Sequence, residues 1–400
     1  MIKSNSAEPQ QDVSGVALFR LGFRPFFLAA TCFAIVSMAF WMAESVFALR
    51  LFGGKSPSLW HAHEMIYGYG LAIVAGFLLT AVRNWTHIRT PHGKSLQGLL
   101  FVWVLARMAA LIPGQQALLA GAMLDSLFIV LVSIALTVPI VQAKLWSNMG
   151  VVSMLYFFLP GQLLYSLDAF GLFQDGQRIG NAIGLYMILS LVLVFSRRVM
   201  PMFIDRGVGY AVTLRNHAWV DMACFGLFMV FAIADIFFVV PEVTGGLAAV
   251  LVVLHTLRLS GWYTHGIWKK PLLWVLYVAY VWIIVGFTLK SLVLVFAVPA
   301  SLAIHAFAVG GVGMMTLGMM SRISLGHTGR NVAHPPTGVS LMFLLLCLGA
   351  CVRVILPLLA SDYYQILVAV AQLLWVASFM QFLYLYALIL IRPRVDGQWG

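Results

Sequence analysis

Twelve apolar runs, each about as long as a membrane-spanning helix, constrain this chain more than any other feature. A helix needs about 20 mostly apolar residues to cross the hydrocarbon core of a bilayer. Only 9% of the 400 residues are charged, whereas soluble domains carry about 25% charged residues. The chain is therefore predicted to be all-α, a polytopic membrane helical bundle with about 12 transmembrane helices. The predicted spans are 21–47, 59–82, 96–112, 117–139, 149–170, 179–197, 218–240, 245–262, 272–294, 298–320, 338–358 and 363–391.

No soluble domain, linker or low-complexity segment interrupts these runs, so residues 16–400 are predicted to form a single transmembrane domain. Residues 1–15 are polar and lack the apolar core of a signal peptide, which predicts a disordered cytoplasmic tail. Lysine and arginine concentrate in alternate loops, so by the positive-inside rule both termini are predicted to be cytoplasmic. The net charge of +11 has the same topogenic explanation, and no nucleic-acid partner is expected.

Polar side chains inside the apolar runs indicate where a function could lie, because an ionisable group in hydrocarbon is costly unless it has a partner. The second run opens with Trp60-His-Ala-His-Glu-Met65, and the tenth run carries His305. A rise of about 1.5 Å per residue places His63 about 6 Å and His305 about 10 Å below the outer surface. Two imidazoles at one level predict a haem b held between helices, with His63 and His305 as axial ligands. A hydrogen bond between the helices is the alternative.

His61 is the other candidate for the axial position in the second run. It lies two residues before His63, so on a regular helix the two side chains point about 200° apart and cannot bind one iron. Which of the two is the axial ligand is left open. Gly70 is predicted to share a face with His63 and to leave room for a flat ring, although close helix packing also explains such glycines.

Three cations near the outer ends of their spans, Arg107, Lys290 and Arg353, are candidate partners for the haem propionates. Arginine suits this role because its forked guanidinium matches a carboxylate. The alternative is that these cations neutralise the acidic side chains predicted at the same level, which are Glu64, Asp125 and Asp235.

A copper site is also considered, with His61 and His255 as candidate ligands, since imidazole and thioether groups bind copper. Met315 and Met319 share a helix face, but methionine stripes more often pack a core. No Cys-x-x-Cys-His motif occurs, which excludes covalently attached c-type haem.

Five segments together resemble the NnrS family of bacterial inner-membrane proteins. They are Phe19-Arg-Leu-Gly-Phe-Arg-Pro-Phe-Phe27, Trp60-His-Ala-His-Glu-Met65, Gly76-Phe-Leu-Leu-Thr-Ala-Val-Arg-Asn-Trp-Thr86, Pro271-Leu-Leu-Trp274, and His305 through Gly-His327-Thr-Gly-Arg330. The resemblance implies a twelve-span, multi-pass protein of the bacterial cell inner membrane that carries haem and copper and acts in nitric oxide stress during denitrification. The chain is also loosely similar to haem–copper oxidase subunit I. It lacks the adjacent histidine pair that those enzymes use for copper in span seven, which argues against a binuclear centre.

These features favour a haem–copper membrane protein that binds or turns over nitric oxide, or transfers electrons, at a haem in the outer half of the bilayer. The expected partners are nitric oxide, the lipid bilayer and an unidentified redox partner. No catalytic residue is assigned, and whether the protein is an enzyme is left open. A transporter of a metal or metal complex is the alternative, because the same charges could line a substrate path. A structural assembly factor for a respiratory complex is a third reading.

Overall fold

The structure is a computed structural model in which residues 16–49, 56–238, 240–293 and 295–400 are described. All regular elements in this part of the chain are helical, and twelve helices are long and apolar enough to cross a membrane, as predicted. The disordered tail predicted for residues 1–15 lies outside the described residues.

The first six spans contain α1 to α8 and two short non-α segments. They are α1 (Phe23–Ser45), then α2 (Pro57–His63), η1 (Glu64–Gly70) and α3 (Leu71–Thr86) in one span, α4 (Lys94–Leu111), α5 (Gln115–Gln142), η2 (Trp146–Asn148) with α6 (Met149–Tyr156) and α7 (Phe158–Ala169), and α8 (Gly176–Gly207).

The last six spans contain α9 to α16. They are α9 (Ala218–Ile233) with η3 (Ala234–Phe238), α10 (Pro241–Ser260), α11 (Pro271–Leu292) after η4 (His265–Lys269), α12 (Ala300–His305) with η5 (Ala306–Gly313) and α13 (Met314–Gly326), α14 (Val339–Val354) with α15 (Leu356–Leu359), and η6 (Ser361–Tyr363) with α16 (Tyr364–Ile391).

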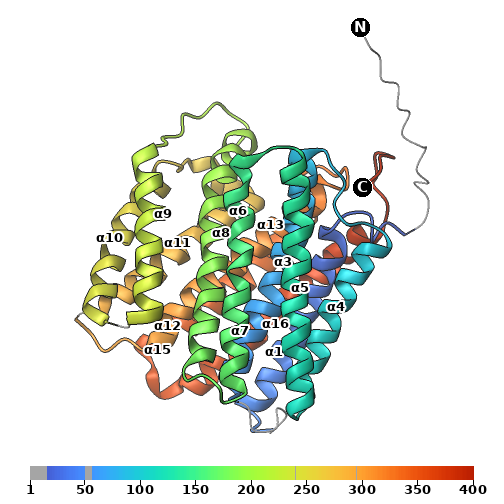
Figure 1. The fold of residues 1–400 in the computed structure, drawn as a ribbon. Coiled ribbons are helices and arrows are strands. Elements are labelled where there is room, and N and C mark those ends of the chain that lie inside the picture. The colour runs from blue at the N-terminus through green and yellow to red at the C-terminus, as the bar shows by residue number, and fades with distance from the viewer. Residues whose placement is uncertain (1–15, 50–55, 239, 294) are drawn as a thin grey trace.

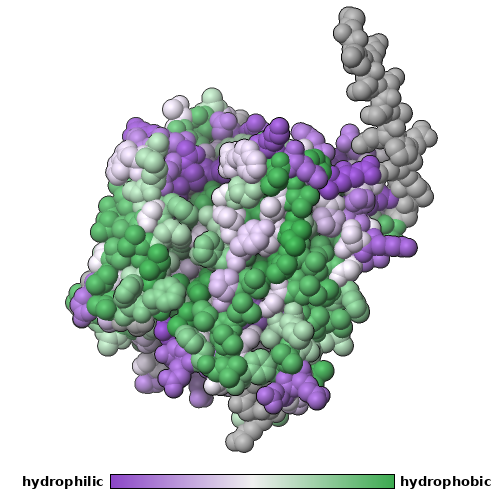
Figure 2. Space-filling view, viewed as in Figure 1, coloured by the Kyte–Doolittle hydropathy of each residue, from purple (hydrophilic) through white to green (hydrophobic). Residues whose placement is uncertain are grey.

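The helices stand side by side, and the face seen in Figure 2 carries mostly apolar side chains along the helices and polar side chains toward its two ends (Figures 1 and 2). The second and tenth spans form its centre. Their most apolar windows are 78% and 67% buried, against 33% for α4 and for the span of α16. The two spans that carry His61, His63 and His305 are therefore the most enclosed ones.

Both central spans change from α-helix to π-helix directly after a histidine. η1 follows His63 and η5 follows His305. π-helical segments are rare and often lie at functional sites. They also shift the angular register of the following residues, so positions beyond residue 63 cannot be assigned to a face by counting 3.6 residues per turn.

The first segment of the family resemblance and residues 326–330, which end the last one, meet at one end of the bundle, where the ring centroids of Phe23 and His327 lie 5.8 Å apart. Ala17 N–H donates to the Ile391 carbonyl (2.9 Å), and Val395 N–H donates to the Thr328 carbonyl (3.1 Å). Burial, with nearby arginines, lowers the pKa of His327 to about 4, so this imidazole is neutral at physiological pH. This junction lies at the other end of the bundle from His61 and His305, and it brings the two ends of the described chain together.

Arg24 is the central residue of this junction. It is fully buried, and its guanidinium donates to the carbonyls of Leu390 (2.7 Å), Arg392 (2.8 Å) and Gly400 (2.8 Å). The end of a helix leaves carbonyl groups without helical partners. Arg24 thus supplies the donors that the end of α16 and the residues after it need.

We expect Arg24→Met to lower the free energy of unfolding by about 3 kcal/mol, because hydrogen bonds to charged groups contribute about 1.5–3 kcal/mol each and the buried carbonyls lose their donor. Thermal unfolding in detergent measures this as a fall in Tm. Arg206→Met, at an exposed position near the end of α8, is the matched control. Equal Tm values for the two variants would contradict this account of Arg24.

Candidate functional site

A cavity of about 600 Å³ opens at the end of the bundle opposite the chain termini, which is the predicted outer end. We call it the histidine cavity. Its walls include Trp41 of α1, His61 of α2, His305 of α12 and Arg353 of α14. Small-molecule and cofactor sites commonly have volumes of about 300–1,000 Å³. The histidine cavity therefore has the size and the mixed lining of a cofactor site.

His305 presents one ring nitrogen in a defined state. Its Nδ1 lies 2.7 Å from the backbone carbonyl of Ser301, one helical turn earlier. Because a carbonyl can only accept, Nδ1 carries the proton and Nε2 keeps its lone pair. Histidines that ligate metals are commonly oriented in this way through the other ring nitrogen.

His61 enters the same cavity from α2 with a different environment. Its ring stacks on the indole of Trp41, with centroids 4.8 Å apart and planes 11° from parallel. Its Nδ1 is buried and has no hydrogen-bond partner among the described residues. His61 is thus fixed by stacking on an aromatic ring rather than by a polar bond.

A smaller space of about 40 Å³ shares His61, His305 and Arg353 with the histidine cavity. Two further buried polar atoms belong to residues that line it. They are one terminal nitrogen of Arg353 and the side-chain oxygen of Gln372, and neither has a partner in the described part of the chain. A buried polar group without a partner costs about 1–3 kcal/mol. Two imidazoles and a guanidinium with unused bonding capacity fit a group that has both a metal and carboxylates, as haem b does.

His63 faces a second cavity, on the other side of α2. This cavity, which we call the carboxylate cavity, measures about 590 Å³ and is lined by His63, Glu64, Asp125 and Gln162. Nδ1 of His63 lies 2.9 Å from Oε1 of Glu64, and Nε2 lies 2.7 Å from Oε1 of Gln162. Both ring nitrogens are therefore engaged with side-chain oxygens.

The structure thus brings His305 together with His61 and not with His63. The predicted separation of about 200° between the two neighbouring histidines agrees with their positions on two different cavities. The predicted axial pair of His63 and His305 is therefore not brought together, and the geometry favours the alternative, His61.

The three predicted propionate partners have different surroundings. Arg107 is buried between two carboxylates, with one nitrogen 2.5 Å from Oε2 of Glu64 and another bonded to Asp125. Nζ of Lys290 lies 2.6 Å from Oδ1 of Asp235. These two cations neutralise acidic side chains, as the alternative explanation expected, whereas Arg353 lines the histidine cavity.

Gly70 has a different neighbour from the one predicted. A Cβ atom added there would lie 2.5 Å from Cδ1 of Ile188 on α8. The missing side chain makes room for this isoleucine and not for a planar ring. Close helix packing, the alternative given for the glycines, therefore explains Gly70.

The structure keeps the other copper candidates apart from His61. His255 is fully buried, with Nδ1 2.7 Å from the Tyr280 hydroxyl and its ring stacked on Phe287 at 5.3 Å. Met315 and Met319 line a separate apolar cavity. Within residues 16–49, 56–238, 240–293 and 295–400, no group of three or more His, Cys, Asp or Glu side chains could hold a metal ion.

Some residues of the histidine cavity were not predicted, because little in the sequence distinguishes them from other residues of a membrane span. Trp41 and Trp375 read as ordinary apolar residues of spans one and twelve, and Gln372 is a single amide in an apolar run. An amide inside a predicted span was the available signal, because polar groups in hydrocarbon need a partner.

Two comparisons with known proteins bear on the family of this chain. None of the curated proteins searched matches this chain at a significant level. The family model described as NnrS protein matches residues 17–394, which include every element described above from α1 to α16. The chain therefore belongs to the NnrS family.

Proposed function

We propose that this protein binds haem b between His61 and His305 in the outer half of the bacterial inner membrane. We further propose that it acts there in nitric oxide stress, either by binding or turning over nitric oxide or by passing electrons. Membership of the NnrS family supports the nitric oxide role. The observation that carries the haem proposal is one cavity of about 600 Å³ lined by two imidazoles from separate spans and by Arg353.

The residues of the cavity have distinct roles in this proposal. His305 is the anchoring ligand, because its bond to the Ser301 carbonyl fixes the ring. His61 would be the exchangeable ligand, since its ring is held by stacking on Trp41 and its Nδ1 has no polar partner among the described residues. Arg353 would pair with a propionate. A haem held by these residues would supply electron transfer, or a binding position for a gas if only His305 held it.

Copper is the second cofactor that the family resemblance implies. Two thioethers, those of Met38 and Met65, line the histidine cavity together with His61 and His305. Imidazole and thioether groups are donors that Cu(I) accepts. Because Nδ1 of His305 is bonded to the Ser301 carbonyl, its Nε2 can bind either haem iron or copper, so these four residues would hold copper in place of haem and not beside it. Metal analysis of the same purified sample distinguishes the two.

Transport of a metal or metal complex is the second candidate function, and the carboxylate cavity is the observation that favours it. His63, Glu64 and Asp125, which are all buried, line this cavity at the predicted outer end. Such groups could receive a cation from outside. Haem retained at a fixed ratio to the chain would count against this candidate, because a cargo is released.

We expect Arg353→Met to weaken haem retention by about tenfold or more, because a hydrogen bond to a charged group contributes about 1.5–3 kcal/mol and each 1.4 kcal/mol is a factor of ten. The rate of haem transfer to a haem-free acceptor protein measures this. Arg178→Met is the control, since Arg178 donates to the Ile236 carbonyl (3.2 Å) and lines neither cavity. Equal transfer rates for the two variants would remove Arg353 from the proposed site.

The experiment that tests the proposed function is the reduced-minus-oxidised absorption spectrum of the purified protein, recorded before and after addition of nitric oxide. A b-type α-band that shifts with nitric oxide supports direct binding. A b-type band that does not respond supports electron transfer. Absence of a Soret band would overturn the haem proposal and leave the transporter.

A further inference from the structure

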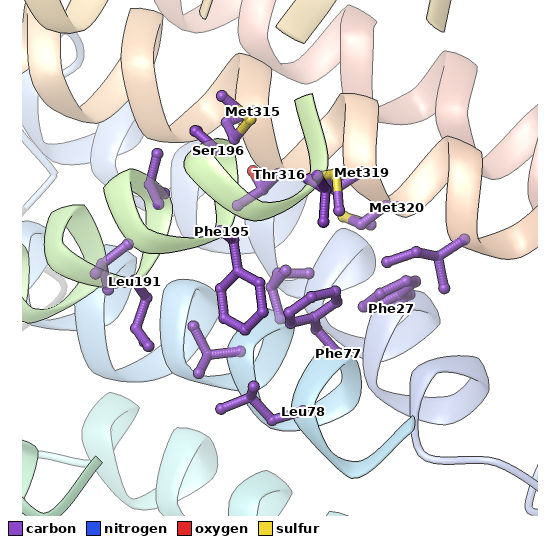
Figure 3. A pocket seen from close by; sticks show the side chains of 16 residues that line it. Phe27, Phe77, Leu78, Leu191, Phe195, Ser196, Met315, Thr316, Met319 and Met320 are labelled. Carbon is purple, nitrogen blue, oxygen red and sulfur yellow. The ribbon is translucent and has the colours of Figure 1, made fainter. Parts of the chain in front are cut away.

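A third, smaller cavity lies deeper in the bundle, between α1, α3, α8 and α13 (Figure 3). We call it the apolar chamber. Its volume is about 70 Å³. The rings of Phe27, Phe77 and Phe195 and the thioethers of Met319 and Met320 face one another across it (Figure 3). The polar side chains in its wall are Ser196 and Thr316, and Oγ1 of Thr316 already donates to the Val312 carbonyl (2.8 Å).

The size and lining of the apolar chamber select its occupant. One water-sized sphere takes about 10–15 Å³ on this measure, so the space holds a few atoms and not a lipid chain or a haem. A buried water needs two to four polar partners, whereas dry apolar cavities bind xenon and similar small apolar species. The chamber therefore suits a small, uncharged, weakly polar molecule.

The apolar chamber shares a wall with the histidine cavity. Ile188 of α8 lines both. Beside it, the hydroxyl of Tyr69, in the wall of the histidine cavity, lies 2.7 Å from Oγ1 of Thr316, in the wall of the chamber. Cδ1 of Ile188 packs against Gly70, where a Cβ atom would lie only 2.5 Å from it. Ile188 and the hydrogen-bonded pair of Tyr69 and Thr316 thus connect the walls of the two spaces.

The chamber is also reachable from its other side. Phe77, Val199, Met319 and Ile323 in its wall are half-buried rather than buried. Because these side chains are apolar, a small molecule dissolved in the hydrocarbon of the bilayer would meet an apolar surface on this side of the chamber. This side is therefore the entrance that we consider.

We propose that the apolar chamber binds a small uncharged gas from the bilayer and passes it to the histidine cavity past Ile188. The inference deepens the proposed function and rests on it for the identity of the gas, which is nitric oxide. The gas-binding property of the chamber is separate and can be tested without haem.

The first test uses xenon as the probe and the purified full-length protein. Val74→Phe places a ring into the chamber from α3, and Met319→Trp fills it from a half-buried position on α13. The xenon NMR shift caused by the protein should be reduced in both variants. It should be kept in the control Val253→Phe, whose valine is 56% exposed on α10. If either chamber variant keeps the native Tm and also gives the same xenon shift as the native protein, the proposal that the chamber binds gas is overturned.

The second test measures the association rate of nitric oxide with the reduced protein, in a His61→Ala background so that release of this imidazole does not limit the rate. We expect Ile188→Phe to slow association by about tenfold, since forcing a larger ring into a packed wall raises the barrier to passage. An unchanged rate with the haem spectrum intact would overturn the path past Ile188. Loss of the haem spectrum in the background variant itself would instead contradict the proposed function.

Discussion

The variant His305→Ala should be purified without haem, whereas His63→Gln should keep the haem content of the native protein. His305 is oriented by the Ser301 carbonyl and faces the histidine cavity, so its removal takes away the anchoring ligand. His63 faces the carboxylate cavity, and a glutamine there can still bond to Glu64 and Gln162. The haem content per chain, measured as the pyridine haemochrome, gives the answer.

The companion variant His61→Ala separates ligand loss from loss of the fold. Because His305 stays in place, we expect this variant to keep a reduced amount of haem in a five-coordinate, high-spin form. The absorption spectrum distinguishes this state from the six-coordinate one. Haem lost from His63→Gln and retained in His305→Ala would reverse the proposed assignment.

The second large effect is expected from Arg107→Leu. Arg107 is 4% exposed and bridges Glu64, which is 1% exposed, and Asp125, which is 5% exposed. Removal of one partner from a buried ion pair costs about 3–5 kcal/mol, because an uncompensated charge stays buried. We therefore expect a large fall in Tm and in the yield of folded protein.

A matched rescue shows whether the charges or the packing matter. Adding Glu64→Gln and Asp125→Asn to Arg107→Leu removes the two orphaned carboxylates, and most of the lost stability should return. Replacing a whole buried ion network by neutral groups is often nearly neutral, and contacting residues are not additive. A triple variant as unstable as Arg107→Leu alone would show that Arg107 acts through packing.

The twelve spans could be predicted because each depends on local composition alone. The opposite directions of His61 and His63 could also be predicted, since they follow from helix geometry over one turn. The NnrS family could be predicted as well, because the matching segments are spread over nearly the whole chain.

Which of these histidines meets His305 could not be predicted, because both faces of α2 carry polar groups. His61 and Ser58 line the histidine cavity, while His63 and Glu64 line the carboxylate cavity. Periodicity gives the angle between residues of one helix and not the rotation of that helix against its neighbours. Gly70 was misplaced for a related reason, because η1 shifts the register after His63.

The partners of the three outer cations could not be predicted from the sequence either. Arg107, Lys290 and Arg353 share a predicted depth, and depth does not tell which of them faces a carboxylate. The structure pairs the first two with acidic side chains and places the third beside the two histidines. Which neighbour each cation faces depends on how the helices pack against one another, and the sequence of one span does not show this.

The most direct test of the haem proposal is the electron paramagnetic resonance spectrum of the oxidised protein, with and without His61. The account predicts one low-spin haem b per chain with two imidazole ligands in the native protein. It predicts a high-spin signal in His61→Ala that returns to low spin when free imidazole is added. A low-spin signal that is unchanged in His61→Ala, or a native protein without a haem signal, would contradict it.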